Sequence, residues 1–196
     1  MPEQIFETVV TSCSPAGAVH VAPMGVRYVG ERVLLKPFKP STTLDNIVAT
    51  GVAVLNLTTD VRVFAGCVTA RRDWPTVPVD TGGGERAVRL AGALAHRLLR
   101  LVELADDVQR PQLWLAPGPT QHHEAFPGFN RAQAAVIEGA VLVSRLHLLP
   151  AQKVDEEMRY LQIAIDKTAG PQELQAWAWL QQAVARHRAG AAGALP

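Results

Sequence analysis

The residues best suited to binding a ligand are basic and hydroxyl side chains in the segment from Lys36 to Asn46, KPFKPSTTLDN. Ser41, Thr42 and Thr43 directly precede a stretch that predicts a short helix, so the unpaired N–H groups of its first turn would point toward them. A phosphate monoester could accept hydrogen bonds from these hydroxyls, from the helix N-terminus and from Lys36 or Lys39. The structural alternative is that one of the first two hydroxyls simply caps the helix.

Upstream of this segment, proline and glycine interrupt a stretch that has strand character. Pro23, Met24 and Gly25 form the interruption, and Arg27 follows it. Such residues leave backbone groups unpaired and let a flat ligand approach the main chain, but they are equally typical of a simple bulge. Because the strands that carry Arg27 and Lys36 are predicted to pair, both basic side chains could address one pocket.

Two further groups of polar residues lie near the start of the second half. Asn130 suits the N-cap of a long apolar helix, and Arg131 beside it would either pair with Glu138 or address an anion in a cleft. His122 and His123 could suggest a metal ligand pair, but adjacent side chains point in different directions and no third ligand follows at helical spacing. We therefore expect no metal site.

Composition argues against several classes of protein. Lys and Arg number 19 against 18 Asp and Glu, and the net charge of +1 argues against a broad basic surface for nucleic acid. No apolar run approaches the roughly 20 residues of a membrane span, and the first residues lack a basic signal-peptide region, so we expect a cytoplasmic protein without a membrane partner. No nucleophile elbow, Walker loop or dinucleotide fingerprint supports a hydrolase, a kinase or a Rossmann enzyme.

Periodicity places strands first and helices second. Alternating and β-branched stretches predict strands at residues 5–12, 18–22, 26–29, 32–36, 52–58, 98–104 and 112–116. Short helices are expected at 44–50 and 61–67, a loop at 71–85, and a boundary at 117–119. Beyond the boundary, apolar patterning predicts three helices, at 131–149, around 154–165, and from Pro171 onward, with Gly170 as a left-handed cap. Segregated strands and helices indicate an α+β fold.

Ordered motifs in both halves of the chain resemble one family. In the first half they are Glu7–Ser12 (ETVVTS), Val21–Arg27 (VAPMGVR), Leu35–Ile47 (LKPFKPSTTLDNI) and Ala53–Val61 (AVLNLTTDV). In the second half they are Gly128–Ala140 (GFNRAQAAVIEGA), Ser144–Pro150 (SRLHLLP) and Asp166–Glu173 (DKTAGPQE). Together they resemble the flavin-reductase-like FMN-binding split barrels, and more specifically the domain-of-unknown-function family four-four-seven.

The resemblance implies a six-stranded antiparallel split β-barrel at residues 1–119, followed by a C-terminal helical subdomain at 120–196 that packs on the barrel. It also implies a homodimer with FMN at the subunit interface. By position, the phosphate would be held by Lys36, Ser41, Thr42 and Thr43, and the isoalloxazine would face Pro23, Met24 and Gly25. Further cofactor-binding positions would be Arg27, Asn46 at the helix start, Asn56 on the next strand, and Arg131 from the same or the partner chain.

Two functions follow from this resemblance. The first is an FMN-dependent oxidoreductase of unknown substrate, whose electron donor could be a reduced nicotinamide and whose side chains need not include a strong acid or base. The alternative is a non-catalytic flavin carrier or a dimeric scaffold, possible in a fold that hosts several activities. The resemblance also suggests a link to methanopterin-dependent one-carbon metabolism.

Overall fold

The structure is a computed structural model that describes residues 4–192, and the chain divides into two compact units. The first unit holds the chain up to Thr58 together with Arg72–Phe126. The second unit holds Thr59–Arg71 and the chain from Pro127 onward. The helical unit therefore includes, besides the C-terminal part expected from residue 120, the short segment Thr59–Arg71 from the middle of the barrel sequence.

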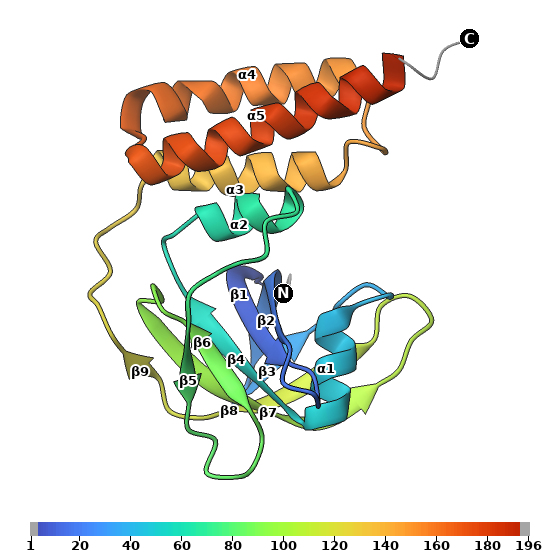
Figure 1. The fold of residues 1–196 in the computed structure, drawn as a ribbon, viewed down its shortest axis with the longest axis vertical. Helices are drawn as coiled ribbons and strands as arrows, with labels where there is room; N and C mark the ends of the chain where they lie inside the picture. The colour runs from blue at the N-terminus through green and yellow to red at the C-terminus, as the bar shows by residue number, and fades with distance from the viewer. Residues whose placement is uncertain (1–3, 193–196) are drawn as a thin grey trace. The chain divides into compact units, whose positions relative to one another are not determined.

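The first unit is built on a closed antiparallel β-barrel (Figure 1). Its strands follow the order β4-β1-β2-β3-β8-β7, and a further pairing of β4 with β7 closes the ring. The six strands are β1 (Phe6–Cys13), β2 (Val19–Val29), β3 (Arg32–Leu35), β4 (Val52–Leu57), β7 (Ala95–Ala105) and β8 (Gln112–Pro117). The short β9 (Gln121–His122) adds to β7. The expected six-stranded antiparallel split barrel is therefore confirmed.

The barrel interior is filled by alternate residues of every strand, as the period of two requires. One buried cluster joins Val10, Val26, Val33, Leu35, Ala53, Leu55, Leu99, Leu113 and Leu115. The helix α1 (Thr42–Thr50) contributes Leu44 and Ile47 to the same cluster. This burial fixes the position of α1, and with it the position of the hydroxyl residues at its start.

Local turn chemistry follows the sequence closely in this unit. Gly17 N–H donates to Ser14 O at 2.8 Å and Gly17 has φ 84°, which makes a tight turn after β1. Val29 pairs directly with Arg32, so Gly30 and Glu31 form a two-residue hairpin loop. Helix α1 ends at Gly51, whose left-handed φ of 75° lets its N–H bond to Ile47 O at 2.8 Å.

Two expectations for the first unit are wrong. The strand 18–29 is not interrupted at Pro23–Gly25, because β2 keeps an unbroken register with β1 from Val19 to Val26. The predicted loop at 71–85 contains β5 (Thr76–Val79), which pairs with β6 (Ala87–Leu90) in a second small sheet. Strand β6 packs across β1 and β4, which gives this Pro- and Gly-rich hairpin a buried surface.

The second unit is a group of four helices. They are α2 (Arg62–Val68), α3 (Arg131–Ser144), α4 (Ala151–Thr168) and α5 (Pro171–Ala192). Helix α3 contacts the other three, and Pro171 opens α5 as predicted. Three details differ from expectation: α3 ends at Ser144 and not at 149, Gly170 has no left-handed φ, and Leu174 is 52% exposed.

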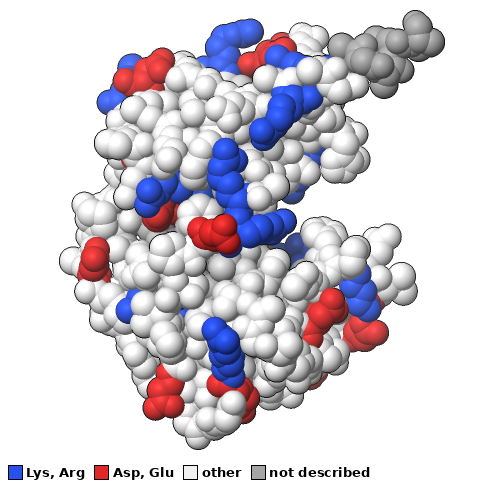
Figure 2. Space-filling view, viewed as in Figure 1, with Lys and Arg blue, Asp and Glu red and all other residues white. Residues whose placement is uncertain are grey.

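None of the described helices is long and apolar enough to cross a membrane. On the face drawn in Figure 2, basic and acidic side chains both occur and most of the surface is uncharged.

Candidate functional site

The start of α1 is the geometric centre of the predicted phosphate cradle. Ser41 is the N-cap, with extended φ −146° and ψ 113°, and its Oγ accepts a hydrogen bond from Leu44 N–H at 3.2 Å. The structural alternative is thus correct for Ser41. This cap uses only the acceptor side of the hydroxyl group, so its O–H can still donate a hydrogen bond to an anion. The N–H groups of Thr42 and Thr43 precede Asp45, whose N–H is the first to bond to a carbonyl of the helix, the Ser41 O, so they have no acceptor within the helix.

The three hydroxyl residues differ in their access to solvent. Ser41 is half-buried, Thr42 is exposed and Thr43 is only 1% exposed. Thr42 and Ser41 therefore form the accessible rim of the cradle, and the Thr43 side chain lies on the barrel side of the helix.

Asn46 holds α1 onto the barrel. The residue lies in the second turn of the helix, past the start where it was expected, and is 6% exposed. Its Nδ2 donates to Ser12 Oγ on β1 at 3.0 Å. This buried bond fixes the distance of the helix start from the sheet, so Asn46 acts on the cradle through the position of α1.

The two lysines beside the cradle have different surroundings. Lys36 follows β3, and its carbonyl accepts from Arg110 Nε at 3.2 Å. Lys39 donates from Nζ to Asp106 Oδ1 at 2.6 Å, in the connection between β7 and β8. The Lys39 hydrogen bond is the main reason that the pKa of Asp106 is lowered. The charge of Lys39 is therefore engaged outside the cradle.

The proposed platform on β2 has a defined face. Met24 packs against the interior cluster, so alternation puts Pro23, Gly25 and Arg27 on the outer face. Arg27 pairs with Leu34 and is 8% exposed. The printed register ends at the pair of Val26 with Leu35, and Lys36 directly follows β3. That Arg27 and Lys36 address one pocket stays a prediction.

The Gly25 position is closely approached by the beginning of the described chain. A Cβ built on Gly25 would lie 2.8 Å from Ile5 Cγ2. Gly25 has no left-handed φ, so its backbone conformation does not require glycine. The close packing with Ile5 does, because a side chain would collide with Ile5. Ile5 therefore covers the backbone that a flat ligand would have to approach.

The side chain of Asn56 is bonded within the protein. It is fully buried, and its Nδ2 lies within hydrogen-bond distance of Val9 O, Thr11 Oγ1 and Val54 O, at 3.1–3.2 Å. Its Oδ1 accepts from Leu90 N–H at 2.7 Å. The amide thereby joins β4 to β1 and β6, and every polar atom of the side chain has a protein partner.

Arg131 belongs to the helical unit. Asn130 caps α3, accepting from Ala132 N–H at 2.7 Å, and its Nδ2 donates to Thr168 O at 3.0 Å. Arg131 itself is exposed and forms no ion pair with Glu138 in the described structure. The N-cap prediction is confirmed, and of the two roles considered for Arg131 the pairing with Glu138 is wrong.

The histidine sequence at 122–123 does not form a site by itself. His123 Nε2 lies 2.8 Å from Nδ1 of His96, a buried residue of β7, and the two rings stack with centroids 5.0 Å apart. Burial lowers the pKa of His96 below its ordinary range. The pKa of His123 is lowered too, first by desolvation and second by the positive charge of nearby Arg89. No group of three metal-ligating side chains occurs within residues 4–192.

Sequence reasoning missed a cavity of about 700 Å³ on the barrel surface. Its lining includes Tyr28, Arg32 and Arg97 together with Val102. Burial raises the pKa of Tyr28. The ring of Tyr28 packs edge-on against that of Phe6, with the ring centroids 5.4 Å apart. These residues come from several strands, so only the strand order could have brought them together.

The chain is similar to several solved flavoproteins. An FMN-bound DUF447 protein from Methanosarcina mazei is 24% identical, with 92% of this chain and 95% of that chain covered and a TM-score of 0.79. A 2-nitrobenzoate 2-nitroreductase from Pseudomonas fluorescens is 21% identical over 63% of this chain and 66% of that chain, with a TM-score of 0.51. An FMN-binding protein from Thermus thermophilus with bound p-hydroxybenzaldehyde is 12% identical over 63% and 74%, with a TM-score of 0.52. These likenesses establish the flavin-reductase-like split-barrel fold.

No curated protein matches the chain. Two family descriptions match most of its length. Residues 6–124 match the N-terminal domain of the family described as protein of unknown function (DUF447), and residues 130–182 match a second domain of the same description. The chain therefore belongs to the DUF447 family.

Proposed function

We propose that the chain binds FMN on its barrel unit and uses it for an electron-transfer reaction. The observation that carries the proposal is the cradle at the start of α1, where the Ser41 and Thr42 hydroxyls lie beside the first N–H groups of the helix, with Lys36 five residues before the cap. The split-barrel fold and the full-length similarity to an FMN-bound relative support it. FMN differs from riboflavin by a phosphate, and a phosphate is the group that this cradle fits.

The residues present fit each part of the cofactor to a different degree. Ser41 and Thr42 would donate hydroxyl hydrogens to the phosphate, and Lys36 would supply positive charge. Arg27, on the outer face of β2, would lie toward the ring. The ring would meet the outer face of β2, where Ile5 now covers Gly25. Ile5 must therefore move aside for a flat ligand to reach that backbone.

The chemistry that FMN supplies when bound is hydride or electron transfer at its ring. The residues of the chain would bind and orient the cofactor, and a guanidinium such as that of Arg27 would favour an anionic reduced ring electrostatically. A reduced nicotinamide is the donor that we propose to test first.

We also propose that two copies of the chain associate through the barrel. Support comes from large side chains that are exposed around the 700 Å³ cavity, including Phe6, Tyr28 and Val102, at 40–51% exposure. Such a concentration of apolar surface is typical of a protein interface. Light scattering coupled to gel filtration would measure the mass in solution, and a monomer at every concentration would contradict this part of the proposal.

The cofactor proposal is tested by comparing FMN with riboflavin on the intact chain. Binding is followed by quenching of flavin fluorescence for the unaltered protein and for Ser41→Asp. Aspartate is as good an N-cap as serine, so α1 should be retained, but its charge would repel the phosphate. We expect FMN affinity to fall roughly tenfold or more, with riboflavin affinity nearly unchanged.

Two results would overturn the proposal at different levels. Failure of the unaltered chain to bind either flavin would refute the cofactor itself. Equal affinity for FMN and riboflavin, unaltered in Ser41→Asp, would refute the cradle. If FMN binds but no reduced nicotinamide is oxidised with any added acceptor, the flavin-carrier alternative gains support over the oxidoreductase.

A further inference from the structure

The helical unit contains a pocket of about 380 Å³ between α3 and α4 that has no place in the proposed flavin site. Its walls are apolar or small, from Ala134, Ala135, Leu161, Ile163 and Ala164. Its charged lining residues are Arg131 and Lys167 near one end and Glu138 toward the other. Arg131 and Lys167 come from two of the three motifs that the sequence analysis quotes from the second half of the chain.

The relative direction of the helices sets these charges apart. The start of α3 meets the end of α4, since Ala132 N–H donates to Thr168 Oγ1 at 3.0 Å. Arg131 and Lys167 therefore lie at the same end. Glu138 is seven residues further along α3, about 10 Å along a helix that rises 1.5 Å per residue. Tyr160, which is 75% exposed, lines the pocket at that second end.

The position of Arg131 is not explained by helix stability. It is the first residue of α3, where the positive end of the helix dipole makes a cation unfavourable, and the first turn has no acidic residue to offset it. Neither Arg131 nor Lys167 has an ion-pair partner in the part of the chain that the structure describes. Lys167 does have a structural reason for its place, in the last turn of α4. An anionic ligand would supply the missing partner for Arg131.

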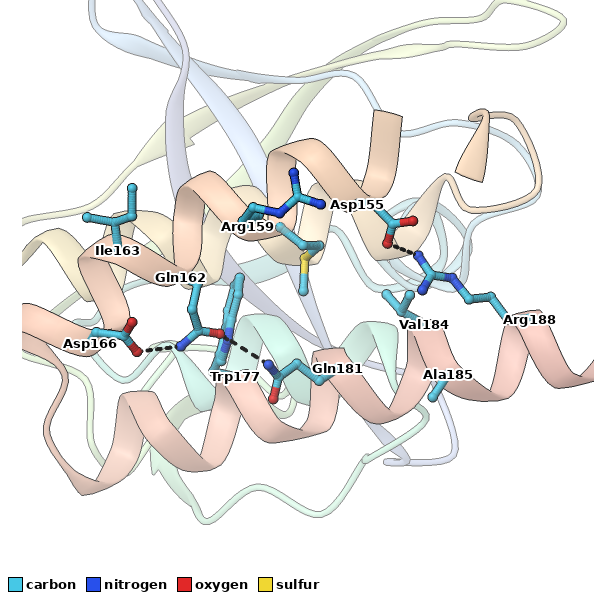
Figure 3. A pocket seen from close by; sticks show the side chains of 11 residues that line it. Asp155, Arg159, Gln162, Ile163, Asp166, Trp177, Gln181, Val184, Ala185 and Arg188 are labelled. Atoms are coloured by element: carbon cyan, nitrogen blue, oxygen red, sulfur yellow. Dashed lines mark hydrogen bonds and ion pairs between the residues drawn. The ribbon is translucent and has the colours of Figure 1, made fainter. Parts of the chain in front are cut away.

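A second groove on the same unit provides the contrast. It has about 530 Å³ between α4 and α5, and Figure 3 shows most of its polar side chains bonded to one another, with the exception of Arg159. Arg188 pairs with Asp155, and Gln162 accepts from Trp177 Nε1 at 2.7 Å. Its polar groups therefore largely satisfy each other. The α3–α4 pocket differs because both cations at its one end lack such partners.

We propose that the α3–α4 pocket binds an elongated zwitterion, with a carboxylate at the Arg131–Lys167 end and an ammonium group at the Glu138 end. The fork of a guanidinium matches a carboxylate, with Lys167 adding a second charge. The apolar walls would cover a methylene chain between the two charges. All residues of this site belong to the helical unit.

The test uses 8-aminooctanoate as the probe, with octanoate and octylamine as matched molecules that each lack one charge. Binding to the full chain is followed by titration of backbone amide chemical shifts. We expect the zwitterion to bind more tightly than either control and to shift amides around Arg131 and Glu138. Arg131→Gln should weaken its binding about tenfold, and Glu138→Gln should remove its advantage over octanoate.

Arg159→Gln is the matched control variant, because Arg159 is an exposed arginine of α4 that lines the other groove. It should leave binding unchanged. Thermal unfolding monitored by circular dichroism confirms that each variant keeps its helices. The proposal is overturned if the three probes bind alike, if none binds, or if Arg131→Gln and Arg159→Gln weaken binding equally in folded protein.

Discussion

Ser41 shows how one hydroxyl can serve two purposes that sequence reasoning treats as alternatives. Its oxygen accepts from Leu44 N–H, which is the ordinary duty of an N-cap. Its hydrogen is still able to point toward an anion bound at the N-terminus of the helix. Finding the cap therefore leaves the phosphate cradle open, and the two roles must be separated by a substitution that keeps one of them.

Asp45 opposes the cradle and provides the first prediction. It is the acidic residue of the first turn of α1 and is exposed. Its charge stabilises the helix start but repels a phosphate bound there. Asp45→Asn should tighten FMN roughly two- to fivefold, as measured by fluorescence titration. Riboflavin serves as the control, and an equal gain for riboflavin would show that the effect is not electrostatic repulsion of the phosphate.

The His96–His123 pair predicts a loss of stability in acid. Burial lowers the pKa of His96 below its ordinary value of 6.5, so the unfolded chain binds a proton more readily than the folded one. Stability is then fully present above about pH 6.5 and is lost as the pH falls below that value. The pKa of His123 is lowered too, so its contribution has the same sign.

Urea unfolding at about pH 7.5 and about pH 5.5 measures this dependence. His96→Gln should reduce the difference between the two midpoints. His147→Gln, at an exposed site on the helical unit, should leave the difference as it is. Burial also lowers the pKa of His20, so part of the dependence should survive in His96→Gln. An undiminished dependence in that variant would contradict the assignment.

Residue roles were predictable where they depend on neighbours in sequence. The caps at Ser41 and Asn130 follow from local chemistry and were found, whereas Gly170 lacks the expected left-handed φ. Asn56 shows the limit, because its partners Val9, Thr11 and Leu90 lie on other strands. A buried amide that joins three strands looks, in sequence, the same as one that faces a ligand.

At the scale of elements, β2 explains why Pro23 does not break its strand. Strand β2 pairs with β1 over Val19–Val26 but with β3 only over Val26–Val29. Pro23 therefore lies where β2 has a neighbour on one side only, and its missing N–H removes no bond on the other. An interruption of the strand was predicted because a single sequence does not reveal which part of a strand has two neighbours.

Helix packing in the second unit predicts that replacing glycine by alanine affects stability differently at two positions. A Cβ on Gly139 of α3 would lie 2.8 Å from Trp177 Cζ3 and 3.0 Å from Leu180 Cδ1, both on α5. Gly139→Ala should therefore destabilise the protein by about 1–3 kcal/mol, because overpacking outweighs the better helix propensity of alanine.

Gly190 of α5 is the control, since nothing lies within 4 Å of the corresponding Cβ. Gly190→Ala should be neutral or slightly stabilising. Chemical unfolding of the two variants compares them directly. If Gly139→Ala were as stable as Gly190→Ala, α3 and α5 would have room to separate, and the close approach would not contribute to stability.

At the scale of the whole molecule, the order of strands and helices could be predicted, but the composition of the units could not. The α+β class and the helical second half follow from periodicity that changes near residue 119. Helix α2 departs from this order, because its apolar residues are buried by α3 and α5, which come more than sixty positions later. No local pattern specifies such a partner.

This arrangement predicts that the barrel cannot be isolated by simple truncation. A fragment ending at residue 126 would keep α2 but lose α3 and α5, exposing Val63 and Phe64, which are 3% and 4% exposed in the full chain. We expect this fragment to aggregate.

The same fragment with Val63→Gln and Phe64→Gln should be markedly more soluble, because the α2 surface would then be polar. Gel filtration compares the two fragments, and the full chain with both changes serves as the converse control. It should lose stability by several kcal/mol, because polar groups would be buried between helices. Equal solubility of the two fragments would show that α2 does not depend on its distant partners.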